Sequence, residues 1–361
     1  MRGRAWIAAV IVLLTACTGS PHHAGSPSVS ATQPTAERLP DIILRADYAA
    51  PIAHWHRVMS ISYGSRLSRL GFIPESTQHS PQPMVPFAFG IASDRSIWIL
   101  DEAKKRVAHF SKSGRYLGQV NGLHFDRFHA HPRDLVVERD RPIVLELGLS
   151  SAGFIDVPRH GRFQRTRLLA GGRSVRTSHL VQTPAAVVGY VSGRPFRPSG
   201  TASSSPYGIY RFAVPGSGLI HRLPGAPLGD GTAIWLHAED SNPFTVTYTT
   251  SNVAASRDLT IRVMDKGRQI QAAVGPLVEA TTQHAAAAYV MIAPSKPGAA
   301  ARFGSGRWFL ELSDDSSPLV WERLPTPAFD DETQVRHITV GSDGSVYLMT
   351  VTDHDVKIFR R

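Results

Sequence analysis

Four short runs of β-branched, aromatic and small apolar residues follow one another between Pro86 and Val120, and turn-forming residues separate them. The runs are Phe87–Ile91, Ile97–Leu100, Arg106–Phe110 and Tyr116–Val120. Runs of about five such residues, bounded by Asp, Ser and Gly, predict a meander of antiparallel strands. A single meander has two apolar faces and cannot bury both, so the chain needs further sheets of the same kind.

The end of the chain repeats this pattern. Two apolar runs, His337–Val340 and Val346–Val351, flank the turn Ser342-Asp343-Gly344-Ser345, and Val356–Phe359 follows. The order of small apolar strand, Asp-Gly-Ser turn, apolar strand and Arg-Val-x-x-Phe resembles a blade of the NHL-type β-propellers. The resemblance implies an all-β propeller fold; it specifies architecture and not activity.

Groups of strands recur every 40 to 50 residues, which is the spacing of propeller blades. We expect six blades, with seven as the alternative if residues 39–85 contain more than one strand pair. A pair of β-sandwiches is the competing architecture. The blades are predicted near residues 86–120, 133–169, 177–223, 232–273, 284–325 and 335–361.

The last group has only three strands, while the apolar run Arg57–Tyr63 near the start has no neighbour to pair with. The economical prediction is that this run supplies the fourth strand of the last blade. Such pairing closes the ring and removes exposed sheet edges. The propeller domain is therefore predicted to span residues 39–361.

The chain begins with the features of a secretory signal, predicted over residues 1–16. Arg2 and Arg4 precede an apolar run, Ala5–Leu14, which is too short to span a bilayer. The run ends in Leu-Thr-Ala-Cys17, which resembles the lipobox of bacterial lipoproteins. The resemblance implies cleavage before Cys17 and attachment of acyl chains such as palmitate to that residue. An ordinary secretory signal with a chance cysteine is the alternative.

Residues 17–38 follow as a lipidated cysteine and a tether rich in Ser, Pro, Thr and Ala. A flexible segment of this length has a root-mean-square reach of roughly 25 Å. We therefore expect a lipid-anchored protein on the outer face of the cytoplasmic membrane. Cys17 is the only cysteine, so the chain forms no internal disulfide and depends on its apolar core.

The net charge of +10 indicates a basic surface, which either is simply solvated or attracts anionic lipids or wall polymers. No nucleic-acid module is recognisable, so no nucleic-acid partner is expected. The sequence contains no GxSxG, Walker A, GxGxxG or HExxH motif. Trp98, Trp235 and Trp308 fall in predicted strands, where core packing between blades is expected.

Two candidate sites remain. A histidine lies near the predicted start of the innermost strand in four blades, and Arg133, Arg176 and Arg336 lie close to three of these histidines. Converging imidazoles at a channel mouth could bind a divalent metal. The four are His131, His179, His284 and His337.

The second candidate is a binding rim on the same face, built by two connections between strands. It combines aromatic and basic residues: His124, Phe125, Arg127, Phe128, His129, Arg194, Phe196 and Arg197. We expect a non-catalytic propeller that binds a protein, peptide or glycan, with no cofactor. The alternatives are a metal-dependent propeller hydrolase or lyase with the histidine site, and a structural subunit of an envelope complex.

Overall fold

The sheet around residues 88–120 shows how this sequence makes strands. In the computed structural model its strands are β4 (Ala88–Ile91), β5 (Ile97–Asp101), β6 (Arg106–Phe110) and β7 (Tyr116–Val120). The turn between β4 and β5 is held by the amide of Ser96, which donates to Asp94 Oδ1 at 2.8 Å. Gly114 has a φ of 82° in the turn between β6 and β7, a conformation that glycine adopts without strain. The predicted meander is confirmed.

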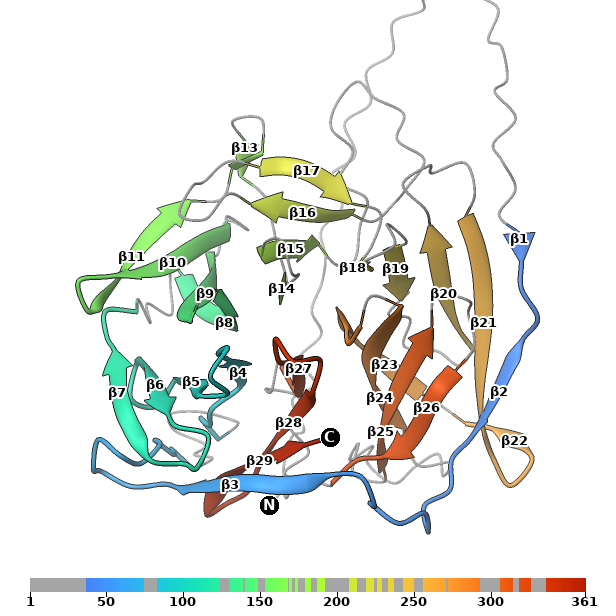
Figure 1. The fold of residues 1–361 in the computed structure, drawn as a ribbon, viewed down its shortest axis with the longest axis horizontal. Helices are drawn as coiled ribbons and strands as arrows, with labels where there is room; N and C mark the ends of the chain where they lie inside the picture. The colour runs from blue at the N-terminus through green and yellow to red at the C-terminus, as the bar shows by residue number, and fades with distance from the viewer. Residues whose placement is uncertain are drawn as a thin grey trace, which may run out of the picture. The chain divides into compact units, whose positions relative to one another are not determined.

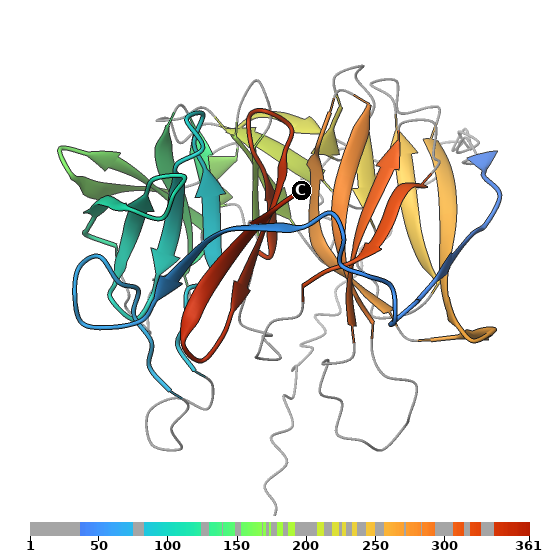
Figure 2. The same cartoon turned by 60° about the horizontal axis from the view of Figure 1, so that its bottom comes forward.

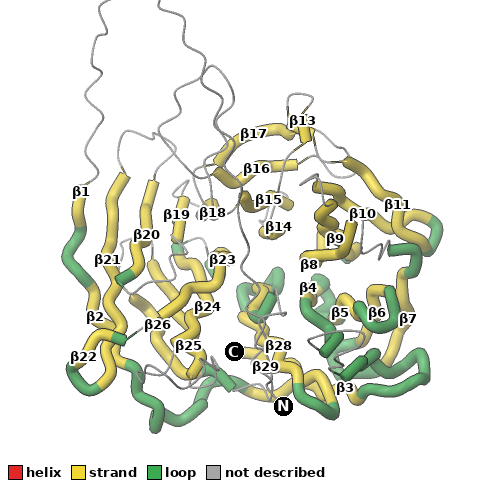
Figure 3. The backbone as a smooth tube through the Cα atoms, turned by 180° about the vertical axis from the view of Figure 1, so that it is seen from behind, coloured by secondary structure: helices red, strands yellow, loops and turns green. Residues whose placement is uncertain are grey.

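The structure describes most of the chain from residue 37 onward. The described residues are 37–74, 83–123, 130–138, 140–148, 153–167, 169–170, 173–174, 179–182, 187–191, 208–212, 219–223, 226–228, 233–236, 243–249, 256–270, 272–282, 284–292, 306–313, 318–325 and 336–361. Cys17 and both connections of the predicted rim, residues 124–129 and 194–197, lie outside them. No helix occurs in the described ranges, so none there could cross a membrane (Figure 3).

Three further sheets repeat the four-stranded antiparallel order. The first contains β8 (Ala130–Glu138), β9 (Arg141–Gly148), β10 (Gly153–Arg159) and β11 (Arg162–Arg167). The second contains β14 (His179–Gln182), β15 (Val187–Val191), β16 (Gly208–Phe212) and β17 (Leu219–Leu223). The third contains β23 (Ala272–Ala280), β24 (Ala285–Ile292), β25 (Gly306–Ser313) and β26 (Pro318–Arg323).

The last sheet joins the two ends of the described chain. Its strands are β27 (Ile338–Val340), β28 (Val346–Val351), β29 (Asp355–Arg360) and β3 (His56–Ser62). Strand β3 pairs antiparallel with β29, with Ser62 opposite Asp355 and Ile61 opposite Val356. The predicted pairing of residues 57–63 with the last three strands is therefore confirmed.

A larger sheet carries the N-terminal segment on its outer edge. It contains β18 (Ala226–Pro227), β19 (Ala233–Leu236), β20 (Phe244–Thr249), β21 (Ser256–Asp265) and the short β22 (Arg268–Gln269). Strands β1 (Glu37–Arg38) and β2 (Ile42–Arg45) pair parallel with β21. This addition was not predicted. A separate two-stranded sheet joins β12 (Leu169–Ala170) and β13 (Arg173–Ser174).

The blade boundaries predicted for residues 232–325 are wrong by one strand. Residues 272–274 were assigned to the fourth blade, but they begin β23, the first strand of the following sheet. The register between β23 and β24 shifts between Val274 and Val278, around Gly275 and Pro276. This break in the strand pattern explains the misassignment, because proline inside a run argues against a regular strand.

The first strands of the sheets lie around a common centre (Figures 1 and 2). Contacts between them run in a cycle, from β4 to β8, β14, β23, β27 and back to β4. The approach of β4 to β8 is so close that a side-chain carbon on Gly90 would lie 2.8 Å from Val137 Cγ2. Antiparallel four-stranded sheets around a centre define a β-propeller.

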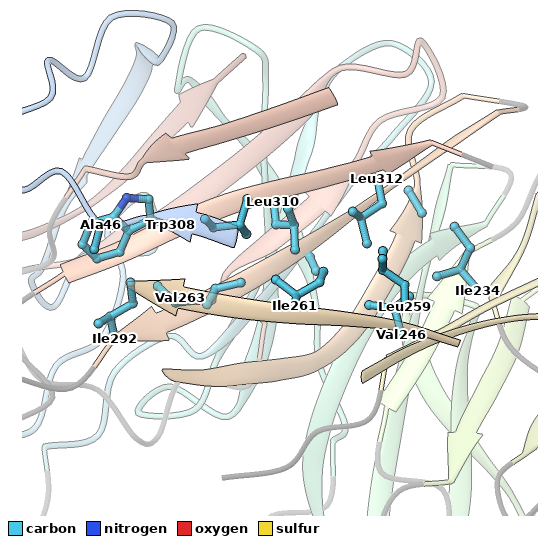
Figure 4. Packing of buried hydrophobic residues seen from close by; sticks show 14 of the residues in the cluster. Ala46, Ile234, Val246, Leu259, Ile261, Val263, Ile292, Trp308, Leu310 and Leu312 are labelled. Carbon is cyan, nitrogen blue, oxygen red and sulfur yellow. The ribbon is translucent and has the colours of Figure 1, made fainter. Parts of the chain in front are cut away.

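Apolar side chains fill the spaces between neighbouring sheets. Between β21 and β25, Ile261 and Val263 face Trp308 and Leu310, all at most 1% exposed (Figure 4). Burying each aliphatic side chain fully contributes about 1.5–3 kcal/mol. The core role expected for Trp308 is confirmed. Trp98 is half-buried and stacks on His109, with ring centroids 3.8 Å apart. The side chain of Trp235 lies outside the described residues.

Candidate functional site

A buried ion pair joins the innermost parts of two sheets. Asp134 lies in β8, and Arg336 lies just before β27. Arg336 Nε donates to Asp134 Oδ1 at 2.8 Å, and its Nη2 donates to Oδ2 at 2.7 Å. Both side chains are 0% exposed. A bidentate guanidinium–carboxylate pair fixes orientation as well as neutralising charge.

Backbone groups of two other sheets complete this network. Asp134 also accepts the amides of Leu135 at 2.8 Å and Leu180, in β14, at 2.7 Å. Arg336 Nη2 donates to the carbonyl of Leu180, and its own amide donates to the carbonyl of Phe87 at 3.0 Å. Arg336 therefore connects segments at the starts of β27, β4 and β14 with β8.

This network limits the chemistry that Asp134 can perform. A carboxylate has about four lone-pair positions, and Asp134 accepts four hydrogen bonds. It therefore has no lone pair left for a metal or for a substrate proton. Asp134 and Arg336 hold the innermost strands in place, and they were not singled out together from the sequence because 202 positions separate them.

The structure does not bring the described candidate histidines together. His131 is exposed in β8, and His337 follows Arg336 directly. His284 precedes β24, the second strand of its sheet, so its predicted place at an innermost-strand start is wrong. His179 is the first residue of β14, and its side chain lies outside the described part. Within the described ranges, no three His, Cys, Asp or Glu side chains are grouped to hold a metal.

His337 points between two sheets. Its ring stacks on Tyr289 of β24, with centroids 4.2 Å apart and 3° between the planes. Burial, and to a smaller extent Arg307, hold the pKa of His337 well below its usual value. Its Nδ1 is buried without a hydrogen-bond partner. His337 is therefore a neutral packing residue at physiological pH. The pKa of His131 is also lowered, first by the part of its side chain that is buried and then by Arg133.

A second buried charged cluster was missed from the sequence. Glu146 in β9 and Asp156 in β10 are both 0% exposed, and Glu146 pairs with Arg165 in β11. Burial, followed by the nearby Glu146, raises the pKa of Asp156 to about 9. The signal in the sequence is an acidic residue inside each of two apolar runs, Pro142–Leu147 and Phe154–Val157.

A clamped loop, residues 64–71, follows β3. Lys104 Nζ donates to the carbonyls of Arg66 at 2.7 Å and Arg69 at 2.8 Å. Arg106 Nη1 donates to the carbonyl of Leu67 at 2.8 Å. Arg106 is itself buried and paired with Asp101 at 2.9 Å. The turn between β5 and β6 therefore fixes the loop against its sheet.

Comparisons with known proteins leave the activity of this chain open. Residues 53–124, from just before β3 to just after β7, match a family described as "Domain of unknown function (DUF7485)". No curated protein matches the chain. Among solved structures, the chain is similar to hydrazine synthase of Kuenenia stuttgartiensis, with 11% identity and a TM-score of 0.44 over 74% of this chain and 77% of that one.

Two further similar structures are enzymes by their descriptions. A streptogramin B lyase has 11% identity and a TM-score of 0.40 over 85% of this chain and 98% of that one. A gluconolactonase of Xanthomonas campestris has 12% identity and a TM-score of 0.41 over 87% of this chain and 99% of that one. Likenesses at this level carry no argument about what this chain binds or converts.

Proposed function

We propose that this protein is a lipid-anchored, non-catalytic binding propeller on the outer face of the cytoplasmic membrane. In this proposal Cys17 carries the acyl anchor and residues 18–36 form the tether, which is two residues shorter than predicted because Glu37 and Arg38 form β1. The propeller has six blades, closed into a ring by β3, and one face binds a protein, peptide or glycan.

The anchoring proposal rests on the N-terminal sequence. The only cysteine of the chain follows Leu-Thr-Ala at the end of a ten-residue apolar run. Each buried methylene of an acyl chain contributes about 0.8 kcal/mol, and two chains give stable anchoring. Residues 36–361 form one compact unit, which is what a tethered module requires.

The observation that favours binding over catalysis is the saturated carboxylate of Asp134. Asp134 is a wholly buried acidic side chain in an innermost strand, and all its lone pairs are used by Arg336 and two backbone amides. A channel-centred acid, base or metal ligand needs a free lone pair. The proposed contact with the ligand is the predicted rim, whose aromatic and basic side chains lie in residues 124–129 and 194–197.

The anchor is tested by growing cells with a clickable palmitate analogue and separating membrane from soluble fractions. The wild-type chain should take up the label and stay with the membrane. The Cys17→Ser variant should lose the label and resist processing to the mature size. A labelled Cys17→Ser chain would overturn the anchoring proposal.

The binding face is tested by photo-crosslinking in intact cells. A photoreactive amino acid replaces Phe125 of the predicted rim or, as the control, Ser113, which is exposed in the turn between β6 and β7. Discrete adducts from position 125 and none from 113 are expected. A stoichiometric divalent metal in the purified wild-type protein, lost in His131→Ala, would favour the metal-dependent enzyme instead.

A further inference from the structure

The clamped loop presents an apolar side chain among positive charges. Residues 64–69 are all exposed, and Leu67 at the turn is 63% exposed. The amide of Arg69 donates to the carbonyl of Arg66 at 3.0 Å, so Leu67 occupies the tip of a tight turn. An exposed leucine at a turn tip, in a loop that the protein has fixed in place, is a feature that core packing does not explain.

The charges around Leu67 are predominantly positive. Residues 64–72 and 101–106 contain five Lys or Arg and two acidic residues, Asp101 and Glu102. Asp101 is neutralised by its buried ion pair with Arg106. The side chains of Arg66, Arg69 and Lys105 remain exposed around the tip.

The backbone of the loop is suited to a medium of low polarity. The carbonyls of Arg66, Leu67 and Arg69 all accept hydrogen bonds from Lys104 or Arg106. The amides of Gly64 and Leu70 are paired with the carbonyls of Leu70 and Ser62. A carbonyl without a partner costs several kcal/mol in hydrocarbon, and these carbonyls carry their partners with them.

An aromatic pair supports the base of the loop. Tyr63 and Phe72 stack with ring centroids 5.0 Å apart, and both are half-buried. Aromatic side chains with one wet edge are enriched at the level of lipid headgroups. From its tip to its base, the loop therefore presents the apolar side chain of Leu67, then exposed cationic side chains, then the aromatic rings of Tyr63 and Phe72.

We propose that the loop formed by residues 64–71 docks on an anionic phospholipid bilayer, with Leu67 inserted among the headgroups and Arg66, Arg69 and Lys105 bound to their phosphates. This order of side chains matches the order of a bilayer surface, from acyl boundary to charged headgroup. This membrane contact is separate from the proposed acyl anchor, because it needs only the side chains of the loop. Together with a tether it would set which face of the propeller is turned to the membrane.

The test uses the chain from residue 17 onward with Cys17→Ser, so that no acyl chain can be attached. Its flotation is measured with phosphatidylcholine vesicles that contain or lack phosphatidylglycerol. We expect binding to the anionic vesicles only, and its loss in 1 M salt, where the Debye length falls to about 3 Å.

Variants then assign the binding to the loop. Arg66→Gln with Lys105→Gln should weaken binding about 25-fold, because each cation near an anionic surface contributes about fivefold. Leu67→Ser should weaken it by about tenfold. The matched controls are Lys112→Gln with Arg115→Gln, exposed at the opposite end of the same sheet, and Ile43→Ser, 62% exposed on β2.

The proposal is overturned by binding that does not depend on phosphatidylglycerol, by no binding at all, or by equal losses in the loop and control variants. Thermal melts of every variant show that each is folded before binding is compared. None of these outcomes bears on acylation of Cys17, so failure of this contact and failure of the anchor are distinguishable.

Discussion

Two of the buried charged clusters combine an arginine with carboxyl groups but surround those carboxyls differently. At the centre, one arginine meets one carboxylate, and backbone amides satisfy the remaining lone pairs of Asp134. In the sheet of β8–β11, a single arginine, Arg165, pairs with Glu146 and also acts electrostatically on Asp156. Among the described residues, neither oxygen of Asp156 accepts a hydrogen bond from an amide or a guanidinium, and the neighbour that raises its pKa is the carboxyl of Glu146.

The difference shows that equally buried carboxyls can have very different donors around them. Asp134 and Asp156 are both wholly buried. Asp134 has a bidentate guanidinium and two amides, so its charge is compensated. Asp156 faces a second carboxyl, and its raised pKa of about 9 means that it holds a proton at neutral pH.

The largest effect should follow from breaking the central pair. Arg336→Met leaves Asp134 charged, buried and without its guanidinium, and should lower the free energy of unfolding by about 3–5 kcal/mol. Urea denaturation at neutral pH measures this change. A loss below 1 kcal/mol would show that water reaches Asp134 and that the comparison is wrong.

Removing the carboxylate charge that Arg336→Met leaves unpaired should recover part of the lost free energy of unfolding. Asp134→Asn in the Arg336→Met background eliminates the carboxylate and keeps an acceptor oxygen for one of the two amides, of Leu135 or Leu180, while its NH2 group faces the other. We expect about 1–3 kcal/mol more stability than in Arg336→Met alone. No recovery would mean that the lost packing of Arg336, and not the buried charge, sets the cost.

A mutation in the second cluster should raise the free energy of unfolding instead of lowering it. Asp156 has a pKa above its unfolded value, so the native state binds more protons and stability falls as the pH rises from about 4 towards 9. Asp156→Asn should stabilise the protein by roughly 1–2 kcal/mol at pH 8 and flatten this dependence. Unfolding free energies measured at pH 5 and pH 8 check both; an unchanged pH slope would contradict the assignment.

The smallest effect should come from an exposed ion pair with similar geometry. Arg95 Nε lies 3.0 Å from Asp343 Oδ2, and its side chain is 48% exposed. Arg95→Ala should cost at most about 0.5 kcal/mol, because water screens such pairs. A cost comparable to that of Arg336→Met would remove burial as the explanation for the first prediction.

The sequence was sufficient to predict the sheets in which Asp, Ser and Gly residues mark the turns between strands. Asp-Arg-Ser and Ser-Gly turns bound the strands of residues 88–120, and the Asp-Gly-Ser turn at 343–345 repeats them. The pairing of residues 57–63 with the last strands followed from counting strands. Strand β23 was misplaced, since Gly275 and Pro276 interrupt it and only pairing with β24 holds the two halves in one strand.

The site was less predictable because its parts are distant in the chain. Arg336 was noted near a channel mouth, but nothing local indicates Asp134 as its partner. The loop 64–71 was not singled out from the sequence. Its shape depends on Lys104 and Arg106, more than 30 positions away, whose side chains reach its carbonyls.

The pairing of β3 with β29 has a consequence for how the chain folds as it is made. Ser60 Oγ donates to Asp355 Oδ2 at 2.5 Å across 295 positions. At 5–20 residues per second, β3 exists for roughly 15–60 s before its partner strand has been synthesised. During that interval β3 is an open edge that can pair with other chains.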